Sequence, residues 1–366
     1  MDFSRRRLLQ LSGAAVAGVV LLDAAPAGAA PRRQRLHLGS YTSSGGRGIG
    51  VGTFDPGTGA VTVDDWSAAV PDPSWLVASA DGSRIYAVSE SVPDGAVSTL
   101  RSGPAGPPVA TGVQQSGWGP THASVHPSGR YLFTAHYGSG GLAVHPIGPD
   151  GTLGPATDVR VHPDGSHVHQ VVPDPTGRWL LATDLGLDTI FGYGFDERTG
   201  TLREVSRTTL RDGTGPRHLV FHPESRYVYV AGERNSTVTV LAFADGILRP
   251  GQVVGTLLRP SLRRNHPGEI LTSSDGRFVY VTNRGDESIA QFAVTGRGRE
   301  LYLVATTPSG GQGPRHAALD ATGRRLFVAN QRSDEVTSFA VDPDRGRLTP
   351  HSERLPATAV AHILLS

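Results

Sequence analysis

A short turn recurs along this 366-residue chain at nearly constant intervals, and an apolar run follows each copy. One copy is Pro127-Ser128-Gly129-Arg130, which precedes Tyr131-Leu132-Phe133. The glycine-equivalent positions are 82, 129, 177, 225, 276 and 323, with spacings of 47, 48, 48, 51 and 47 residues. A period of about 40–50 residues with several short strands per unit is typical of a β-propeller. Helical repeats of similar length are disfavoured, because the turns are rich in Gly and Pro and the runs in β-branched and aromatic residues.

Each repeat unit reads as four strands. One strand runs into the Gly-Arg turn, a second leaves it, and a third follows, as in Thr237–Phe243. A second recurring turn, such as Asp196-Glu197-Arg198-Thr199-Gly200, leads to the fourth strand. Turns rich in Asp, Pro and Gly suit connections between antiparallel strands. We therefore expect four-stranded antiparallel blades.

The two ends of the chain predict one further blade. Residues Leu36–Val63 read as the second, third and fourth strands of a unit that lacks its first strand. The terminal segment Ala357–Leu365 reads as a lone first strand. Pairing the two gives a seventh blade that closes the ring, and closure removes the open sheet edges of a linear array. The prediction is a single seven-bladed propeller domain over residues 31–366, or seven units of about 48 residues.

Residues 1–30 have the pattern of an export signal. Arg5-Arg6-Arg7 precedes an apolar run from Leu11 to Leu22, and small residues follow up to Ala30. A cationic start, a short apolar segment and an Ala-x-Ala-like site define a cleaved leader, and the run is too short to span a bilayer. The paired arginines after Ser4 favour the twin-arginine route. We expect a secreted or periplasmic protein with no membrane attachment after cleavage.

The composition excludes several chemistries. All 34 Lys and Arg residues are Arg, and the chain has no Cys. A cysteine nucleophile, a thiolate metal site, a disulfide and a lysine Schiff base are therefore impossible. The formal net charge of +1 argues against nucleic acid as a partner, since phosphate binding usually needs a marked basic excess. We expect a small-molecule partner and a monomer.

The repeat also separates scaffold from candidate site. His126 and His222 occupy the recurring turn, so we interpret both as structural. The start of each first strand and the end of each second strand should line one mouth of the central channel, where ligand pockets usually lie. Polar residues gather in these columns, although strand positions in stacked sheets are usually apolar; they include Thr121, His122, His169, Gln170, Arg217, His218, Glu269, Arg315, His316, Glu90, Asn283, Tyr137, Glu233 and Arg284. They form either a ligand site or a structural polar network between blades.

The motifs in these columns resemble those of the seven-bladed lactonase family, which includes 6-phosphogluconolactonases of the propeller type and carboxymuconate lactonizing enzymes. The resemblance covers all of residues 31–366, and its motifs follow in the expected blade order: Gly119-Pro120-Thr121-His122, Ala135-His136-Tyr137-Gly138, Ser166-His167-Val168-His169, Gly215-Pro216-Arg217-His218 and Asn283-Arg284-Gly285.

The resemblance implies a catalytic set of His169, Arg217, Glu233 and Arg284. His169 or Glu233 would act as a general base on water, and the guanidiniums would hold a substrate anion and stabilise the oxyanion. Six further residues are predicted to bind substrate: His122, His167, His218, Glu269, Asn283 and Arg315. No Gly-x-Ser-x-Gly elbow is present in the sequence, which disfavours a serine acyl-enzyme. His167 and His169 alternate on one strand face without a third ligand of convincing spacing, so we expect neither metal nor cofactor.

Three functions remain open from the sequence. The first is an exported hydrolase of a sugar-type or related carboxylic lactone, similar to 6-phosphogluconolactonase. The second is a lactonizing lyase of the muconate cycloisomerase type, which would use the same residues in reverse on a diacid. The third is a non-catalytic binding propeller. Export separates the chain from cytoplasmic sugar phosphates, which favours an unphosphorylated substrate.

Overall fold

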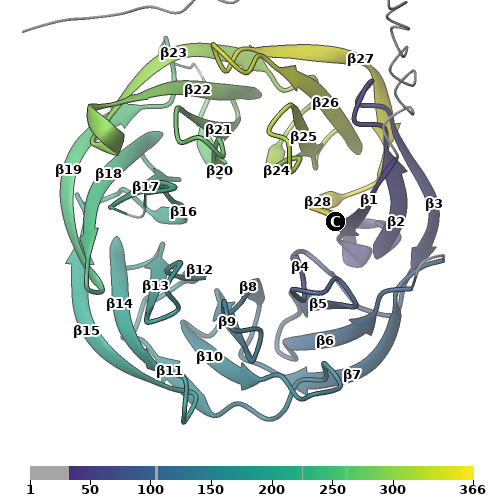
Figure 1. Cartoon of the computed structure of the whole chain (residues 1–366), viewed down its shortest axis with the longest axis vertical. Helices are drawn as coiled ribbons and strands as arrows, with labels where there is room; N and C mark the ends of the chain where they lie inside the picture. Colours follow the sequence, from purple (N-terminus) through teal and green to yellow (C-terminus); the bar gives the residue numbers. More distant parts are fainter. Residues whose placement is uncertain (1–32, 104–105, 225, 260, 262) are drawn as a thin grey trace, which may run out of the picture.

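The computed structural model describes residues 33–366 except 104–105, 225, 260 and 262. The predicted leader, residues 1–30, and Ser225 of the recurring turn lie outside the described residues. Seven four-stranded antiparallel sheets surround a central channel, as Figure 1 shows. No helix in the described part of the chain is long and apolar enough to cross a membrane.

In each blade the strands follow one another from the channel outward. The inner strands are β4 (Leu76–Ala78), β8 (Pro120–Val125), β12 (Val168–Pro173), β16 (Pro216–Phe221), β20 (His266–Thr272), β24 (Pro314–Leu319) and β28 (Val360–Leu365). The second strands are β5 (Arg84–Ser89), β9 (Tyr131–His136), β13 (Trp179–Asp184), β17 (Tyr227–Gly232), β21 (Phe278–Arg284), β25 (Arg325–Asn330) and β1 (Gln34–Ser40).

The third and fourth strands of each blade lie farther from the channel. The third strands are β6 (Ala96–Arg101), β10 (Gly141–Pro146), β14 (Thr189–Asp196), β18 (Thr237–Ala244), β22 (Ser288–Thr295), β26 (Glu335–Val341) and β2 (Ile49–Phe54). The fourth strands are β7 (Val109–Gln115), β11 (Asp158–Val161), β15 (Thr201–Thr209), β19 (Ile247–Gly255), β23 (Glu300–Pro308), β27 (Leu348–Pro356) and β3 (Val61–Ser67). Two single-turn 3-10 helices, η1 (Thr42–Ser44) and η2 (Gly296–Gly298), lie in loops.

The ring closes as the sequence predicts. β28 pairs antiparallel with β1, with Leu38 opposite Ile363, and the order β28-β1-β2-β3 completes the seventh blade. Figure 1 shows the C-terminal strand beside the N-terminal strands. The core lies between neighbouring blades, where apolar faces of adjacent sheets meet; Phe133 of β9 and Leu180 of β13, for example, are fully buried in one cluster.

The recurring turn joins neighbouring blades, which explains its composition. Gly177 has φ of +73°, a conformation that glycine adopts without strain. His126 Nε2 donates to the carbonyl of Gly177 at 2.9 Å, and a Cβ on Gly177 would lie 2.4 Å from that nitrogen. His222 approaches Gly276 in the same way, at 2.5 Å from a notional Cβ. The structural interpretation of His126 and His222 is confirmed.

Candidate active site

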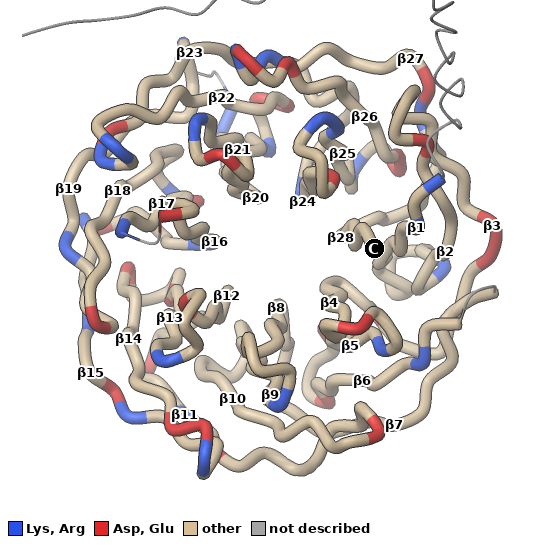
Figure 2. The backbone as a smooth tube through the Cα atoms, viewed as in Figure 1, with Lys and Arg blue, Asp and Glu red and all other residues tan. Residues whose placement is uncertain are grey.

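The inner strands begin at one face of the ring, here called the upper rim, and end at the opposite face, here called the lower mouth. Outer strands carry many charged residues, whereas the inner strands carry few (Figure 2). Apart from histidine, the ionisable side chains of the seven inner strands are Arg217, Glu269 and Arg315. Arg217 and Arg315 are the second residues of their strands, at the upper rim, and Glu269 is the fourth of seven, midway along its strand.

A β-bulge near the start of the inner strands explains how consecutive residues both reach the channel. In β16 the pairing jumps from Pro216 opposite Gly232 to Leu219 opposite Val230, so Arg217 and His218 together face the single residue Ala231. The same two-against-one pairing occurs in β8, β12, β20 and β24. Such bulges re-aim side chains and are frequent beside active sites. The two polar columns of the sequence therefore form one dense cluster at the upper rim.

A carboxylate between two guanidiniums lies at the centre of the upper rim. Glu233 follows β17, and its Oε2 lies 2.7 Å from Arg284 Nη2 and 3.1 Å from Arg217 Nε. Glu233 Oε1 lies 4.0 Å from His266 Nδ1. The side chains of Glu233 and Arg284 keep 20% and 16% of their surface exposed, so this ion pair borders solvent. Arg217 lies deeper and donates from Nη1 to the carbonyl of Gly268 at 2.7 Å.

Electrostatics keep this carboxylate ionised. Burial alone would raise the pKa of Glu233, but the guanidiniums of Arg284 and Arg217 outweigh it and lower that pKa below its usual value. Burial lowers the pKa of Arg217 to about 9, and the positive Arg284 and Arg315 act in the same direction. Arg217 nevertheless remains charged near neutral pH. The pair thus presents positive charge and a carboxylate in its basic form at one place.

A second ion-paired group continues the upper rim. Arg315 of β24 donates from Nη2 to the hydroxyl of Tyr41 at 2.7 Å and lies 3.6 Å from Glu90 Oε2. The Tyr41 hydroxyl in turn donates to Glu90 Oε2 at 2.6 Å. The side chains of Arg315 and Glu90 are 17% and 22% exposed. Because the Tyr41 hydroxyl hydrogen is used on Glu90, the guanidinium of Arg315 is the donor here that suits a carbonyl or carboxylate oxygen.

His169 lies deeper beside these charges. Its ring is 5.0 Å from that of His218 and 5.8 Å from that of Tyr137, and its Nδ1 has no hydrogen-bond partner among the described residues. Burial and the positive Arg217 hold the pKa of His169 well below its usual range, so the ring is neutral. His167 stacks on Tyr137 with ring centroids 4.5 Å apart and donates from Nδ1 to the Tyr137 carbonyl at 2.8 Å.

Below the rim, an aromatic and histidine layer crosses the channel; we call it the channel plug. The Trp75 ring lies 4.2 Å from those of His122 and His362, and 5.2 and 5.3 Å from those of His316 and His218. Trp75 thus contacts four other blades, so its ring crosses the channel axis. The plug comprises Trp75, His122, His218, Glu269, His316 and His362.

Glu269 is the acidic member of the plug. Its carboxyl lies 3.0 Å from His218 Nδ1 and 3.3 Å from His316 Nε2, and it accepts a hydrogen bond from the Ile270 N–H at 3.1 Å. Burial raises the pKa of Glu269 to about 8, despite the opposing charge of Arg217. Around neutral pH this carboxyl therefore holds its proton and can donate a hydrogen bond.

Comparison with known proteins assigns the family. Residues 35–364 match the model of the lactonase family with a seven-bladed β-propeller. The chain belongs to this family. It is 33% identical over 240 residues to a 6-phosphogluconolactonase of Bacillus subtilis, covering 63% of this chain and 68% of that protein. A 6-phosphogluconolactonase of Pectobacterium carotovorum is also 33% identical, over 70% of this chain and 78% of that protein.

A solved structure gives a similar result. The periplasmic gluconolactonase of Pseudomonas aeruginosa superposes with a TM-score of 0.86 and 31% sequence identity, covering 91% of this chain and 99% of that one. The chain is therefore 6-phosphogluconolactonase-like in family and fold.

Of the predicted catalytic residues, Glu233 contacts both Arg217 and Arg284, and His169 lies nearby. Of the predicted substrate-binding residues, Arg315 lies at the upper rim, His122, His218 and Glu269 lie in the plug, and His167 lies beside Tyr137 at the edge.

Asn283 lies apart from this cluster. It is fully buried, and its Nδ2 donates to the Thr256 carbonyl at 3.1 Å and to Ser288 Oγ at 3.2 Å. Its Oδ1 accepts from Asn265 Nδ2 at 3.0 Å. These bonds tie β21 to the loop that connects β19 of the preceding blade with β20, so the structure gives Asn283 a role in linking two blades.

Two upper-rim residues, Tyr41 and His266, were not among the sequence candidates. Tyr41 follows β1 in the closing blade, which has no Gly-Arg turn from which to count. His266 lies ten residues before Gly276, and the equivalent positions are Gly119, His167, Gly215 and Gly313. The departure of His266 from this glycine-rich column is the signal that could have revealed it.

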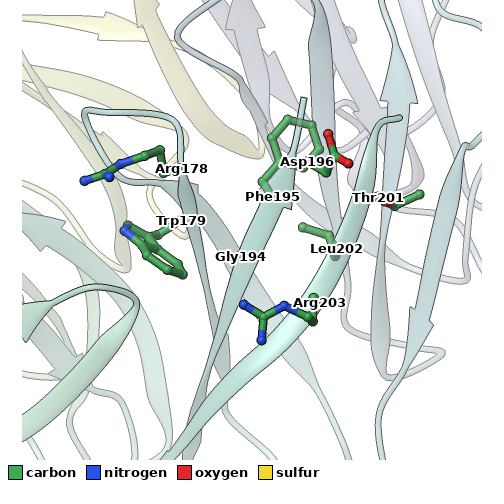
Figure 3. Close-up of a pocket in the computed structure, with 8 residues that line it drawn as sticks. All are labelled: Arg178, Trp179, Gly194, Phe195, Asp196, Thr201, Leu202 and Arg203. Atoms are coloured by element: carbon green, nitrogen blue, oxygen red, sulfur yellow. The ribbon is translucent and has the colours of Figure 1, made fainter. Parts of the chain in front are cut away.

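A hollow of about 480 Å³ lies on the outside of the blade formed by β12–β15, apart from the upper rim. Figure 3 shows Arg178 and Trp179 on one side of it, and Phe195, Asp196 and Leu202 on the other. Arg178 and Asp196 belong to the two recurring turns, so this hollow is built mainly from scaffold positions. Within the described residues, no three His, Asp or Glu side chains gather closely enough to hold a metal ion.

Proposed function

We propose that this chain is an exported lactonase that hydrolyses a sugar-type or related carboxylic lactone at the upper rim. The observation that carries the proposal is the contact of Glu233 Oε2 with both Arg217 and Arg284, while no arginine of the described residues donates a hydrogen bond to Oε1. The arrangement supplies a base and positive charge within one partly exposed cluster.

The proposed chemistry follows from these positions. Glu233 accepts a proton from water through Oε1 as the water oxygen adds to the lactone carbonyl carbon. Arg284 and Arg315 donate to the oxygen that becomes negative, which is where preorganised donors accelerate acyl transfer most. The ring C–O bond then breaks, and the proton passes from Glu233 to the leaving alkoxide, giving a hydroxy acid. Arg217 holds Glu233 in place.

Export and the choice of substrate belong to the same proposal. The cationic, apolar and small-residue segments of residues 1–30 support export. The protein of similar fold from Pseudomonas aeruginosa is described as a periplasmic gluconolactonase. An exported enzyme meets sugar lactones without phosphate. We therefore expect glucono-1,5-lactone to be turned over at least as well as its 6-phosphate.

A pH-stat assay tests the proposal. The purified protein is assayed on glucono-1,5-lactone, its 6-phosphate and a muconolactone, with spontaneous hydrolysis subtracted. Glu233→Gln should lower kcat/KM by about 10²-fold or more, because loss of a positioned base typically costs that much.

Glu197→Gln is the matched control, because Glu197 pairs with Arg130 on the outer surface at 2.7 Å. Unchanged turnover in a folded Glu233→Gln variant would rule out the proposed base. Lactone formation from a muconate would indicate the lyase, and absence of turnover on the whole panel would indicate a binding propeller.

A further inference from the structure

The lower mouth holds a hollow that the lactone chemistry does not use. It has a volume of about 600 Å³ and lies between the channel plug and the ends of the inner strands. Small-molecule sites usually measure about 300–1,000 Å³. The hollow is thus large enough for a ligand and is separated from the upper rim by the Trp75 ring, which crosses the channel.

The walls of the lower mouth are apolar because regular alternation resumes below the bulge. Two residues past each plug position, the same strand face meets the channel again. The residues at this level that line the hollow are partly exposed and, apart from Ser124, aliphatic; they are Val77, Ser124, Leu271, Ala318 and Leu364, together with Val172 two residues past Gln170. Each aliphatic member also packs against a core cluster between blades and stays partly exposed. Apolar surface gathered around a hollow marks an interaction site more often than scattered surface apolar residues do.

The floor of the lower mouth is polar but carries no formal charge near neutral pH. The Nδ1 atoms of His122 and His362 are buried and have no hydrogen-bond partner among the described residues, although both residues line the hollow and are only 3% exposed. Burial holds the pKa of His122 well below its usual range and lowers that of His362 to about 3, so both rings are neutral. Glu269 holds its proton there, as described above.

We propose that the lower mouth is a second ligand site, which binds a small uncharged amphipathic molecule with a hydrocarbon body and one hydroxyl or carbonyl head. The body would pack on Val77, Leu271 and Leu364, and the head would bond to the histidines of the plug. A charged head is disfavoured because the walls are apolar and a buried charge needs a partner. The upper rim, by contrast, carries ion-paired side chains and is proposed to bind a polar, sugar-type lactone.

The test uses 1-octanol as the probe and octanoate as its charged counterpart, with titration calorimetry and saturation-transfer NMR on the wild-type protein. Octanol should bind with a single saturable site, and octanoate at least about tenfold more weakly, since tenfold corresponds to only about 1.4 kcal/mol. Val77→Glu, which places a charge in the wall, should weaken octanol binding by about tenfold or more. Val113→Glu is the matched control, because Val113 lies in a strand on the outer edge and is already 57% exposed.

A second variant covers the case in which Val77→Glu does not fold. Ala318→Phe fills the hollow without adding charge and should also abolish octanol binding. The proposal is overturned if octanol shows no saturable binding, if both glutamate variants bind equally, or if octanoate binds more tightly. It is also overturned if sedimentation shows a dimer that Val77→Glu dissociates, because the mouth would then be a contact between copies.

Turnover of lactone is measured on the same samples and should be unchanged in Val77→Glu. The binding experiment therefore succeeds or fails independently of the proposed hydrolysis at the upper rim.

Discussion

At the upper rim the inner strands present Arg217, Arg315 and His169, whereas toward the lower mouth the same strands present Val220, Ala318 and Val172. The backbone differs as well as the side chains. Near the rim a bulge places two consecutive residues opposite one, and below it each residue again has a single partner. The comparison shows that a propeller concentrates polar groups where its strands depart from regular pairing, and leaves regular segments to packing.

Among variants at the two ends of the channel, we expect Arg217→Met to have the largest effect on lactone turnover. Arg217→Met should lower kcat/KM for lactone hydrolysis by about 10²-fold or more, because Glu233 would lose the guanidinium that holds it and a misplaced base typically costs that much. Arg130→Met is the control, because Arg130 forms an exposed ion pair on the outside of the ring. Steady-state kinetics on samples shown to be folded by circular dichroism make the measurement. Similar losses in both variants would mean that the upper rim is no more important than the surface.

A smaller effect concerns the pH dependence at the upper rim. Of the charges that lower the pKa of Glu233 against the effect of burial, Arg284 has the largest influence. Arg284→Met should therefore raise that pKa, and the acid limb of the kcat/KM profile should move to higher pH by about one unit or more. Profiles between pH 4 and 7 keep spontaneous hydrolysis low. An acid limb that stays in place would exclude Glu233 as the group that titrates.

The channel plug between the two ends should show itself in stability. The pKa of Glu269 is raised from 4.5 to about 8 in the folded protein, so the folded state keeps a proton that the unfolded state releases. Its contribution to stability is fully present below pH 4.5 and is lost as the pH rises toward 8. Glu269→Gln should flatten this part of the stability profile. The difference between the calorimetric Tm values at pH 5 and pH 8 should be a few degrees smaller in the variant than in the wild-type protein. The same difference in both proteins would contradict the raised pKa of Glu269.

The smallest effect is expected at the lower mouth. Val172→Thr keeps the shape of a partly exposed wall residue and should leave lactone kcat/KM within about twofold, with a stability change of about 1 kcal/mol or less. The same assay used for Arg217→Met detects this. A loss of turnover comparable to that of an upper-rim variant would show that the two ends are not chemically independent.

Much of this architecture could be predicted from the sequence, because a blade is a local unit and its turns have fixed chemistry. The spacing of Gly129, Gly177 and Gly276 located the blades, and counting back from them located Arg217 and Arg315. The closing blade was predicted from the fragments at both ends, and β28 with β1–β3 confirms it.

The rest depends on three-dimensional details that the repeat does not record. The bulge inserts one residue into the rim segments of β8, β12, β16, β20 and β24, and only the pairing register reveals that Arg217 and His218 both reach the channel. Asn283 shares a column with rim residues, yet it bonds to the loop that connects its blade with the preceding one. Tyr41 joins Arg315 from the closing blade, across 274 positions of sequence.

The closing pair of strands brings the ends of the described chain together. Leu365 lies opposite Leu36, and the Ser366 N–H donates to the Arg35 carbonyl at 3.0 Å. A short linker could therefore join the last residue to the first strand, and the circle of blades has no inherent starting point. A gene opened at a peripheral turn and fused across the old ends would encode the same ring in a permuted order, with both channel openings unchanged.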